Sequence, residues 1–202
     1  MLSIIINLIN IIFNILNLSL LDILSYMENE QNKEFNFFQL QNGSKITCHG
    51  KPKKNDIAYL KKEYNIDVII TILSDKEGAE DIHRYTEEEG NIKWIHLPIK
   101  GANMTCLKKE ETIKMILDSL LNLYEEMQNK KRIIFIHCAA GLHRTGIILY
   151  TILRMTGETK EKALDIIKDI RIETYKYCGE KRINYAESYL VEPLLDIIKK
   201  EK

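Results

Sequence analysis

The chain has 202 residues, of which 45% are hydrophobic and 29% charged, a composition that suits a globular protein with one well-buried core. Its 29 basic and 29 acidic residues balance, which excludes an overall field that would draw the chain to nucleic acid or to an anionic membrane. Any recognition of an anion must therefore be local. The four cysteines form no Cys-x-x-Cys pair and favour reduced thiols in the cytoplasm; they are Cys48, Cys106, Cys138 and Cys178.

Residues 1–26 form an apolar segment that is predicted to be helical. The run from Leu2 to Leu24 carries four asparagines at helical spacing on one face, namely Asn7, Asn10, Asn14 and Asn17. It lacks the basic start and the cleavage site of a signal peptide. Because the asparagines and Asp22 are costly in hydrocarbon, an interfacial or helix-packing segment is as well supported as a spanning helix, and contact with a membrane is one expectation. The alternative is that Met27 is the true start and the lead is dispensable.

The next part of the chain alternates between strand and helix signals. Residues 27–43 are expected to be a linker, polar between Glu28 and Glu34. Val68 to Leu73 is a continuous β-branched run, typical of a strand covered on both faces. The predicted elements are a strand over 44–49, a turn over 50–52, a helix over 56–64 capped by Asn55, a strand over 68–73, an acidic helix over 79–89, a strand over 93–97 and a loop over 98–106.

The alternation continues to the end of the chain. The patterns predict a helix over 109–127, a strand over 132–137, a helix over 144–155, a helix over 160–171, a loop over 173–179 and a helix over 182–199. Helical spacing marks as core candidates Ile113, Ile116, Leu117, Leu120, Leu121, Ile166, Ile167, Ile170, Leu190, Leu194, Leu195 and Ile198. Residues 44–200 are therefore expected to form one α/β domain whose central, mostly parallel sheet is flanked by helices.

The segment between the strand at 132–137 and the following helix has the pattern of a phosphate-binding loop. It reads His137-Cys138-Ala139-Ala140-Gly141-Leu142-His143-Arg144-Thr145-Gly146. A loop entering a helix presents backbone N–H groups where the helix dipole favours an anion. Gly141 lets the chain curl so that these amides converge. The residues expected to cradle a phosphate are Ala139, Ala140, Gly141, Leu142 and His143.

Each polar residue of this segment has a chemical role in the hypothesis. The same field should lower the pKa of Cys138, giving a thiolate that attacks phosphorus and forms a phosphocysteine intermediate. The planar fork of Arg144 can hold two phosphate oxygens. Thr145 can donate its hydroxyl to the sulfur when the cysteine leaves, and His137 can hold the cysteine backbone. A lone cysteine is usually a small buried hydrophobe, but the joint pattern would arise by chance on the order of once in a million.

This segment, His-Cys-x-x-Gly-x-x-Arg-Thr-Gly, resembles the signature of the cysteine-based protein tyrosine phosphatase superfamily. Residues from about 44 to 192 also resemble that catalytic domain in order and spacing, through the Gly50-Lys51-Pro52 turn, the strand Ile66 to Leu73, and Trp94 to Ile99. The compact length is similar to small atypical dual-specificity enzymes. The resemblance implies a phosphoric monoester hydrolase that acts on phosphorylated proteins. Neither metal nor cofactor is expected, because Cys and His are not grouped at ligand spacing.

The sequence departs from that family at the general acid. Such enzymes carry an aspartate on a mobile loop, whereas Leu97 to Asn103 has none and no carboxylate lies between Trp94 and Glu110. Either Asp75 or Glu77 supplies the acid, although Asp75 is better explained as a helix N-cap, or the leaving group needs little protonation.

The second option keeps other substrates open. Lys100-Gly101 resembles RNA 5′-triphosphatases, and His143 to Gly146 resembles inositol pyrophosphate phosphatases. A non-catalytic phosphate-binding module is a further alternative, although such a module would not need the thiol of Cys138.

Several surface residues have two interpretations each. A basic set either rims the pocket and favours polyanions or is ordinary solvated surface; it comprises Lys100, Lys108, Lys109, Lys176, Lys181 and Arg182. Tyr175 and Tyr177 either seat an aromatic or nucleotide group or cover the core. His143 either contacts substrate or projects to solvent. Cys48 or Cys178 could approach Cys138 only through the fold.

Overall fold

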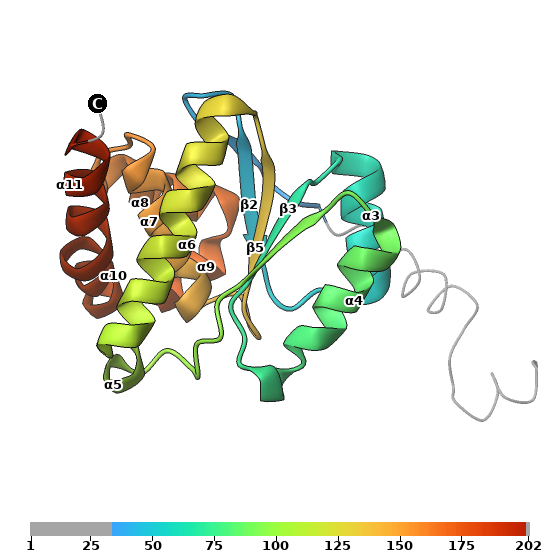
Figure 1. Ribbon diagram of the computed structural model, residues 1–202, viewed down its shortest axis with the longest axis horizontal. Coiled ribbons are helices and arrows are strands. Elements are labelled where there is room, and N and C mark those ends of the chain that lie inside the picture. Colours follow the sequence, from blue (N-terminus) through green and yellow to red (C-terminus); the bar gives the residue numbers. More distant parts are fainter. Residues whose placement is uncertain (1–33, 201–202) are drawn as a thin grey trace, which may run out of the picture. The chain divides into compact units, whose positions relative to one another are not determined.

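The computed structural model describes residues 34–200 (Figure 1). The apolar segment at 1–26, its expected membrane contact and the first part of the linker lie outside the described residues. Within residues 34–200, none of the helices combines the length and the hydrophobicity that a bilayer crossing requires.

A sheet of five strands forms the centre of the domain, in the order β1-β2-β5-β3-β4. The strands are β1 (Phe38–Gln39), β2 (Lys45–His49), β3 (Val68–Thr71), β4 (Lys93–His96) and β5 (Ile133–His137). All neighbours pair in parallel except β1, which is antiparallel to β2. The predicted mostly parallel sheet is confirmed. The sequence did not predict β1, because a strand of two residues has no readable period.

The register of the sheet aligns the carboxyl ends of its parallel strands. His137, the last residue of β5, pairs with His49 on one side and with Thr71 on the other, and Thr71 pairs with His96. The segments that follow these strands therefore meet at one edge. Ligand sites of open α/β sheets lie at such an edge.

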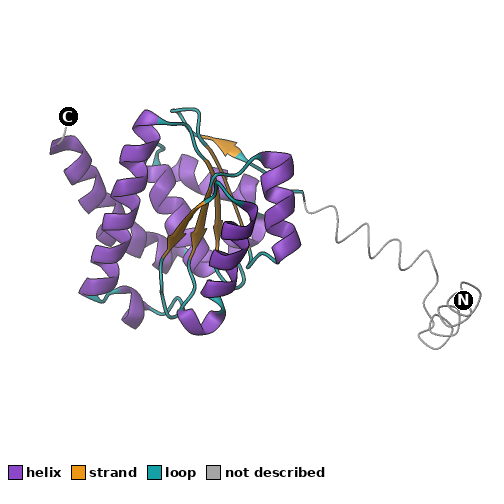
Figure 2. Ribbon diagram, turned by 45° about the vertical axis from the view of Figure 1, so that its right-hand side comes forward, coloured by secondary structure: helices purple, strands orange, loops and turns teal. Residues whose placement is uncertain are grey.

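Helices cover both faces of this sheet. Figures 1 and 2 show α3 and α4 on one face and the remaining long helices on the other. The helices are α3 (Lys54–Tyr64), α4 (Ala79–Glu89), α5 (Met104–Leu107), α6 (Glu110–Asn129), α7 (His143–Met155), α8 (Lys160–Ile170), α9 (Ile172–Cys178), α10 (Glu180–Ala186) and α11 (Glu192–Lys200). A 3-10 helix, η1 (Asp75–Glu77), and a π-helical segment, η2 (Glu187–Val191), complete the elements. Every residue of α7 from Arg144 to Leu153 is buried, so the helix that follows the phosphate loop is held on all sides.

The structure corrects two predicted loops. The segment at 98–106 was expected to lack structure, but α5 begins within it because the side chain of Asn103 accepts a hydrogen bond of 2.8 Å from the backbone N–H of Cys106. The segment at 173–179 is the helix α9, which ends at Gly179, where the backbone turns to a φ of +74°. The start of α3 also differs, because its cap is Lys53 instead of Asn55.

The predicted helix over 182–199 is interrupted. It divides into α10, η2 and α11, and the π-helical turn begins at Glu187. The carboxylate of Glu187 accepts a hydrogen bond from Tyr150 and forms an ion pair of 2.7 Å with Arg154, both on α7. A wider helical turn at this point lets Glu187 face α7 while the flanking turns remain packed.

The predicted core positions are confirmed in most cases. The buried ones are Ile116, Leu120, Ile166, Ile167, Ile170, Leu190, Leu194 and Ile198. The others are partly buried against the same core, and they are Ile113, Leu117, Leu121 and Leu195. The helical period therefore located the apolar face of each helix, and the partly buried residues lie at its margin.

Candidate active site

The phosphate loop leaves β5 at Cys138 and enters α7 at His143. At Gly141 the backbone has a φ of +70°, and a Cβ there would lie 2.3 Å from the carbonyl carbon and oxygen of His49. The turn after β2 supports the loop from below, because the N–H of Lys51 donates to the carbonyl of Ala139 at 3.1 Å. Glycine is thus required at Gly141 both by the left-handed backbone and by the chain that passes beneath it.

Two residues of the α8–α9 region support the same loop from the other side. Arg171 Nη1 donates to the carbonyls of Gly141 and Ala140, at 2.8 and 3.2 Å, and Thr174 Oγ1 donates to that of Gly141 at 2.7 Å. Sequence reasoning missed both residues. No local pattern marks them, because they act only through contacts made by the fold.

Cys138 is 3% exposed and lies at the bottom of this loop. Burial alone would raise the pKa of its thiol, but the nearby hydroxyl of Thr145, the backbone N–H groups of Thr145 and Leu142 and the charge of Arg144 lower the pKa below its usual value. Of the residues predicted to cradle a phosphate, Leu142 thus directs its amide at the sulfur, and a second amide comes from Thr145 in the first turn of α7. The arrangement favours a thiolate at Cys138 near neutral pH.

The two other buried cysteines differ from Cys138 in their chemistry. Burial raises the pKa of Cys48 and of Cys178 to about 12. Cys48 lies near the hydroxyl of Thr174, with a sulfur to oxygen distance of 3.6 Å. Cys178 packs against α7, where a Cβ added at Gly146 would lie 2.6 Å from its sulfur. Both are neutral thiols at neutral pH, and the glycine of the Arg-Thr-Gly motif makes room for Cys178.

Arg144 is buried, and three of its N–H bonds point at fixed acceptors. Nη1 donates to Glu77 Oε2 and to the carbonyl of Ile99, both at 2.8 Å, and Nη2 donates to Glu77 Oε1 at 2.7 Å. A guanidinium has five N–H bonds, so the edge shared by Nε and the second N–H of Nη2 remains. This edge is a planar fork of two donors, the geometry that binds two phosphate oxygens.

Glu77 does not have the properties of a general acid. Hydrogen bonds from Arg144 lower its pKa to about 2, although burial opposes the shift, and the backbone and hydroxyl of Ser74 also favour the carboxylate. Ser74, which donates to Glu77 Oε2 from its N–H at 2.9 Å and from its hydroxyl at 2.8 Å, caps η1. The prediction that Asp75 is this N-cap is therefore wrong: Asp75 is the exposed first residue of η1. The hypothesis that Glu77 supplies the acid is contradicted, since its carboxylate holds Arg144 instead.

The loop at 98–103 lies against the phosphate site without a carboxylate. The buried Ile99 fastens it to Arg144, and the neighbouring Lys100 is exposed. Arg182 holds the other end of this loop, since its Nε donates to the carbonyl of Ala102 at 3.3 Å and its Nη1 to that of Cys178 at 3.1 Å.

His143, in the phosphate loop, is affected by the same arginine. Burial together with the charges of Arg182 and Arg144 lowers the pKa of His143. Among the predicted basic rim, Arg182 thus bonds to the loop at 98–103, and its charge acts on His143 of the phosphate loop.

Two other rim candidates have partners of their own. Lys109 lies 3.4 Å from Glu111, and Lys108 lies over the ring of Tyr189. Tyr175 and Tyr177 are 41% and 59% exposed on α9. The remaining lysines, Lys176 and Lys181, are exposed.

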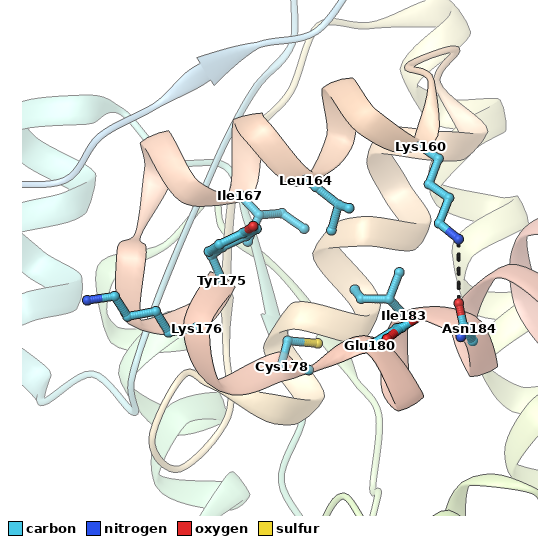
Figure 3. A pocket seen from close by; sticks show the side chains of 10 residues that line it. Lys160, Leu164, Ile167, Tyr175, Lys176, Cys178, Glu180, Ile183 and Asn184 are labelled. Atoms are coloured by element: carbon cyan, nitrogen blue, oxygen red, sulfur yellow. Dashed lines mark hydrogen bonds between the residues drawn. The ribbon is translucent and has the colours of Figure 1, made fainter.

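Tyr175 and Lys176 instead line a groove between α8, α9 and α10 with a volume of about 420 Å³ (Figure 3). A second groove of about 360 Å³ lies beside the loop at 98–100. Neither groove includes Cys138 or Arg144. Tyr175 thus forms part of the wall of a groove, together with Ile167 of the core.

Comparison with known proteins agrees with this geometry. Residues 42–158, more than half of the chain, match a family described as "Polymorphic toxin system, DSP-PTPase phosphatase". A search of curated proteins by sequence found no match.

Solved structures share the fold at low sequence identity. The catalytic domain of the PP-IP phosphatase SIW14 from S. cerevisiae has a TM-score of 0.57 and 17% identity, over 82% of this chain and 91% of that one. Kinase associated phosphatase has a TM-score of 0.55 and 18% identity, over 79% of this chain and 100% of that one. A structure of TpbA from P. aeruginosa in complex with phosphotyrosine has a TM-score of 0.53 and 15% identity, over 82% and 91% of the two chains.

Proposed function

The chain belongs to the DSP-PTPase phosphatase family of polymorphic toxin systems and is a cysteine-dependent phosphatase, and from this premise we propose that Cys138 is its nucleophile in the hydrolysis of phosphate monoesters. One observation carries the proposal. The sulfur of Cys138, the amides of Thr145 and Leu142 and the open edge of Arg144 converge at the start of α7. A phosphoryl group placed there meets a thiolate and two sets of donors at once.

The proposed reaction has two displacements. The thiolate of Cys138 attacks phosphorus, a P–S bond forms, and the P–O bond to the leaving group breaks with its electrons remaining on that oxygen. Water then attacks phosphorus, gives up a proton to solvent, and displaces the thiolate, to which Thr145 donates its hydroxyl hydrogen bond. Throughout, Arg144 follows the equatorial oxygens with its fork.

The lack of a protonated carboxylate at this site determines which substrates fit best. Glu77 is ionised and bonded to Arg144, and the loop at 98–103 offers no acid. A leaving group must then depart with little help, which a phenol with a pKa of about 10 does far more readily than an aliphatic alcohol. We therefore place phosphotyrosine in proteins ahead of phosphoserine and phosphothreonine as the substrate, with action in the cytoplasm, where the thiol stays reduced.

A phosphoanhydride is the second candidate substrate. Its leaving group is a phosphate that needs no protonation, and the loop that lacks the acid contains Lys100 and is held by Arg182. Within residues 34–200, no carboxylate forms an ion pair with Arg182. Its charge is therefore available to a second phosphate, and SIW14, a PP-IP phosphatase by description, shares the fold.

The test is phosphate release by the full chain, with EDTA present, from an aryl phosphate, a phosphotyrosine peptide, a phosphoserine peptide, a 5′-triphosphorylated RNA and an inositol pyrophosphate. We expect turnover of the first two, complete loss in Cys138→Ser, and no loss in the control Cys106→Ser. Turnover of only the RNA or the pyrophosphate would select the second candidate. Activity that survives Cys138→Ser, or that EDTA abolishes, would exclude the cysteine mechanism.

A further inference from the structure

Three side chains connect the outer part of the sheet to the residue before the nucleophile. Trp94 on β4 donates its indole Nε1–H to the hydroxyl oxygen of Thr71 at 2.8 Å, and Thr71 Oγ1 lies 2.9 Å from Nε2 of His137. Thr71 ends β3 and His137 ends β5, and these two residues are paired in the sheet register. The chain of contacts therefore crosses three adjacent strands and ends beside Cys138.

The chemistry of these groups fixes the direction of the hydrogen bonds. An indole N–H can only donate, so Thr71 accepts from Trp94. The structure gives the hydroxyl proton of the fully buried Thr71 no acceptor other than His137 among the described residues, so Thr71 donates to Nε2. The ring proton of a neutral His137 must then reside on Nδ1.

The state of His137 agrees with this assignment. Burial, with smaller effects from the charges of Lys51 and Arg144, lowers its pKa to about 3, so the ring is neutral at neutral pH. The backbone of Cys138 acts in the opposite direction and favours the protonated ring. In the described part of the chain no atom meets the geometric limits of a hydrogen bond with Nδ1, so this buried nitrogen faces the backbone at Cys138 through a looser contact. The imidazole thus bonds to Thr71 through Nε2 and leaves Nδ1 on the side of the Cys138 backbone.

The contacts from Trp94 through Thr71 to His137 are called the relay below. The indole of Trp94, at the start of this relay, is itself held in place. Its ring is stacked between His83 of α4 and His96 of β4, with centroid distances of 4.2 and 4.8 Å. Nε2 of His96 lies 2.8 Å from the carbonyl of Leu73, and His83 lies 3.7 Å from each of Glu80 and Glu87. A ring clamped on both faces keeps its N–H aimed at Thr71.

We propose that Trp94 and Thr71 are positioning residues for the phosphatase reaction, which act by locking the tautomer and orientation of His137 and through it the backbone of Cys138. The proposal rests on the proposed role of Cys138 as the nucleophile. Loss of the relay should let the ring take the other tautomer. The loop amides that stabilise the thiolate would then be less well aligned with the sulfur.

The experiment compares Thr71→Val, Thr71→Ser and Trp94→Phe with wild type in the full chain, with Thr86→Val as control. Thr86 is a buried threonine whose hydroxyl bonds only within α4, to His83. We expect Thr71→Val and Trp94→Phe to lower kcat/KM about 3-fold to 10-fold, the value of a buried hydrogen bond, and to move the acid limb of its pH profile upward. Thr71→Ser keeps the hydroxyl, so its kcat/KM and the acid limb of its pH profile should match those of wild type.

A second readout separates this proposal from the proposed function. The rate of alkylation of Cys138 by iodoacetamide as a function of pH reports the thiolate without any turnover. An upward shift in Thr71→Val supports the relay even if no tested phosphate ester is hydrolysed. Equal acid limbs and equal alkylation profiles in wild type, Thr71→Val and Trp94→Phe would overturn the relay, as would the same shift in Thr86→Val.

Discussion

The ion pair with Glu77 fixes the orientation of Arg144, and this benefits the binding of phosphate. The carboxylate occupies one edge of the guanidinium and leaves the other edge for phosphate. A free arginine would lose side-chain entropy when it binds substrate, whereas this one is already ordered. The benefit requires that Glu77 stay ionised, which it does over most of the pH range.

The stability of the fold should therefore depend on Glu77 in acid. Its pKa is about 2 in the folded protein against 4.5 as the reference value, so the pair stabilises the fold fully above about pH 4.5 and loses this effect as the pH falls towards 2. Denaturant unfolding should show that Glu77→Gln is less stable than wild type at neutral pH, with a difference that shrinks between these two values. Glu80→Gln, an exposed change, is the control. A difference that does not vary with pH would contradict this account.

Among single residues, the sequence predicted the side chains of the motif but not the side chains that hold them in place. Cys138, Arg144 and Thr145 could be predicted because the motif fixes their spacing. Glu77 was misassigned as a possible acid, because a spacing pattern cannot show that the Ser74 cap turns this carboxylate towards Arg144. Thr174 could not be found at all, since it lies 33 positions from the carbonyl that it holds.

Among the elements, the phosphate loop is shaped as much by its neighbours as by its own residues. The turn after β2 lies beneath Gly141, and α9 holds its carbonyl from the side. The conformation of the loop therefore depends on the turn after β2 and on α9 as well as on its own residues.

A matched pair of glycines tests this view. Gly141→Ala and Gly101→Ala both force a left-handed residue, at φ of +70° and +83°, which costs roughly 1–2 kcal/mol. Only the first places a Cβ against the backbone of His49, while no atom lies within 4 Å of the second. We expect urea unfolding to show a much larger loss of stability for Gly141→Ala, together with loss of vanadate binding. Equal losses in the two variants would contradict the support by the β2 turn.

Periodicity predicted the long elements well and the short ones poorly. α4 was predicted with its observed bounds, because an acidic helix between two glycines has clear ends. β1, α5 and α9 escaped because elements of a few residues are determined by caps and tertiary contacts. The π-helical turn in η2 likewise begins at Glu187, whose ion pair with α7 no local pattern encodes.

Across the whole molecule, the fold makes one buried thiol acidic and keeps two others neutral. Cys48 and Cys178 have a pKa raised to about 12 by burial, whereas that of Cys138 is lowered. In a Cys106→Ser background, iodoacetamide at about pH 6.5 should modify Cys138 alone, and phosphate should protect it. Mass spectrometry locates the adduct. Modification of Cys48 or Cys178 at a similar rate in the folded protein would be inconsistent with these environments, whereas all three should react in denaturant.

The parallel pairing of β2 with β5 has a consequence for how the enzyme comes into being. It joins segments that lie 88 positions apart, as between Ser44 and Arg132, so a long loop must close before the pairing stabilises anything. The cradle cannot exist earlier, because the turn after β2 and the segment after β5 support each other. We therefore expect catalytic competence to arise late in folding. A chain that has not yet closed this loop should lack phosphatase activity, because the cradle around Cys138 has not formed.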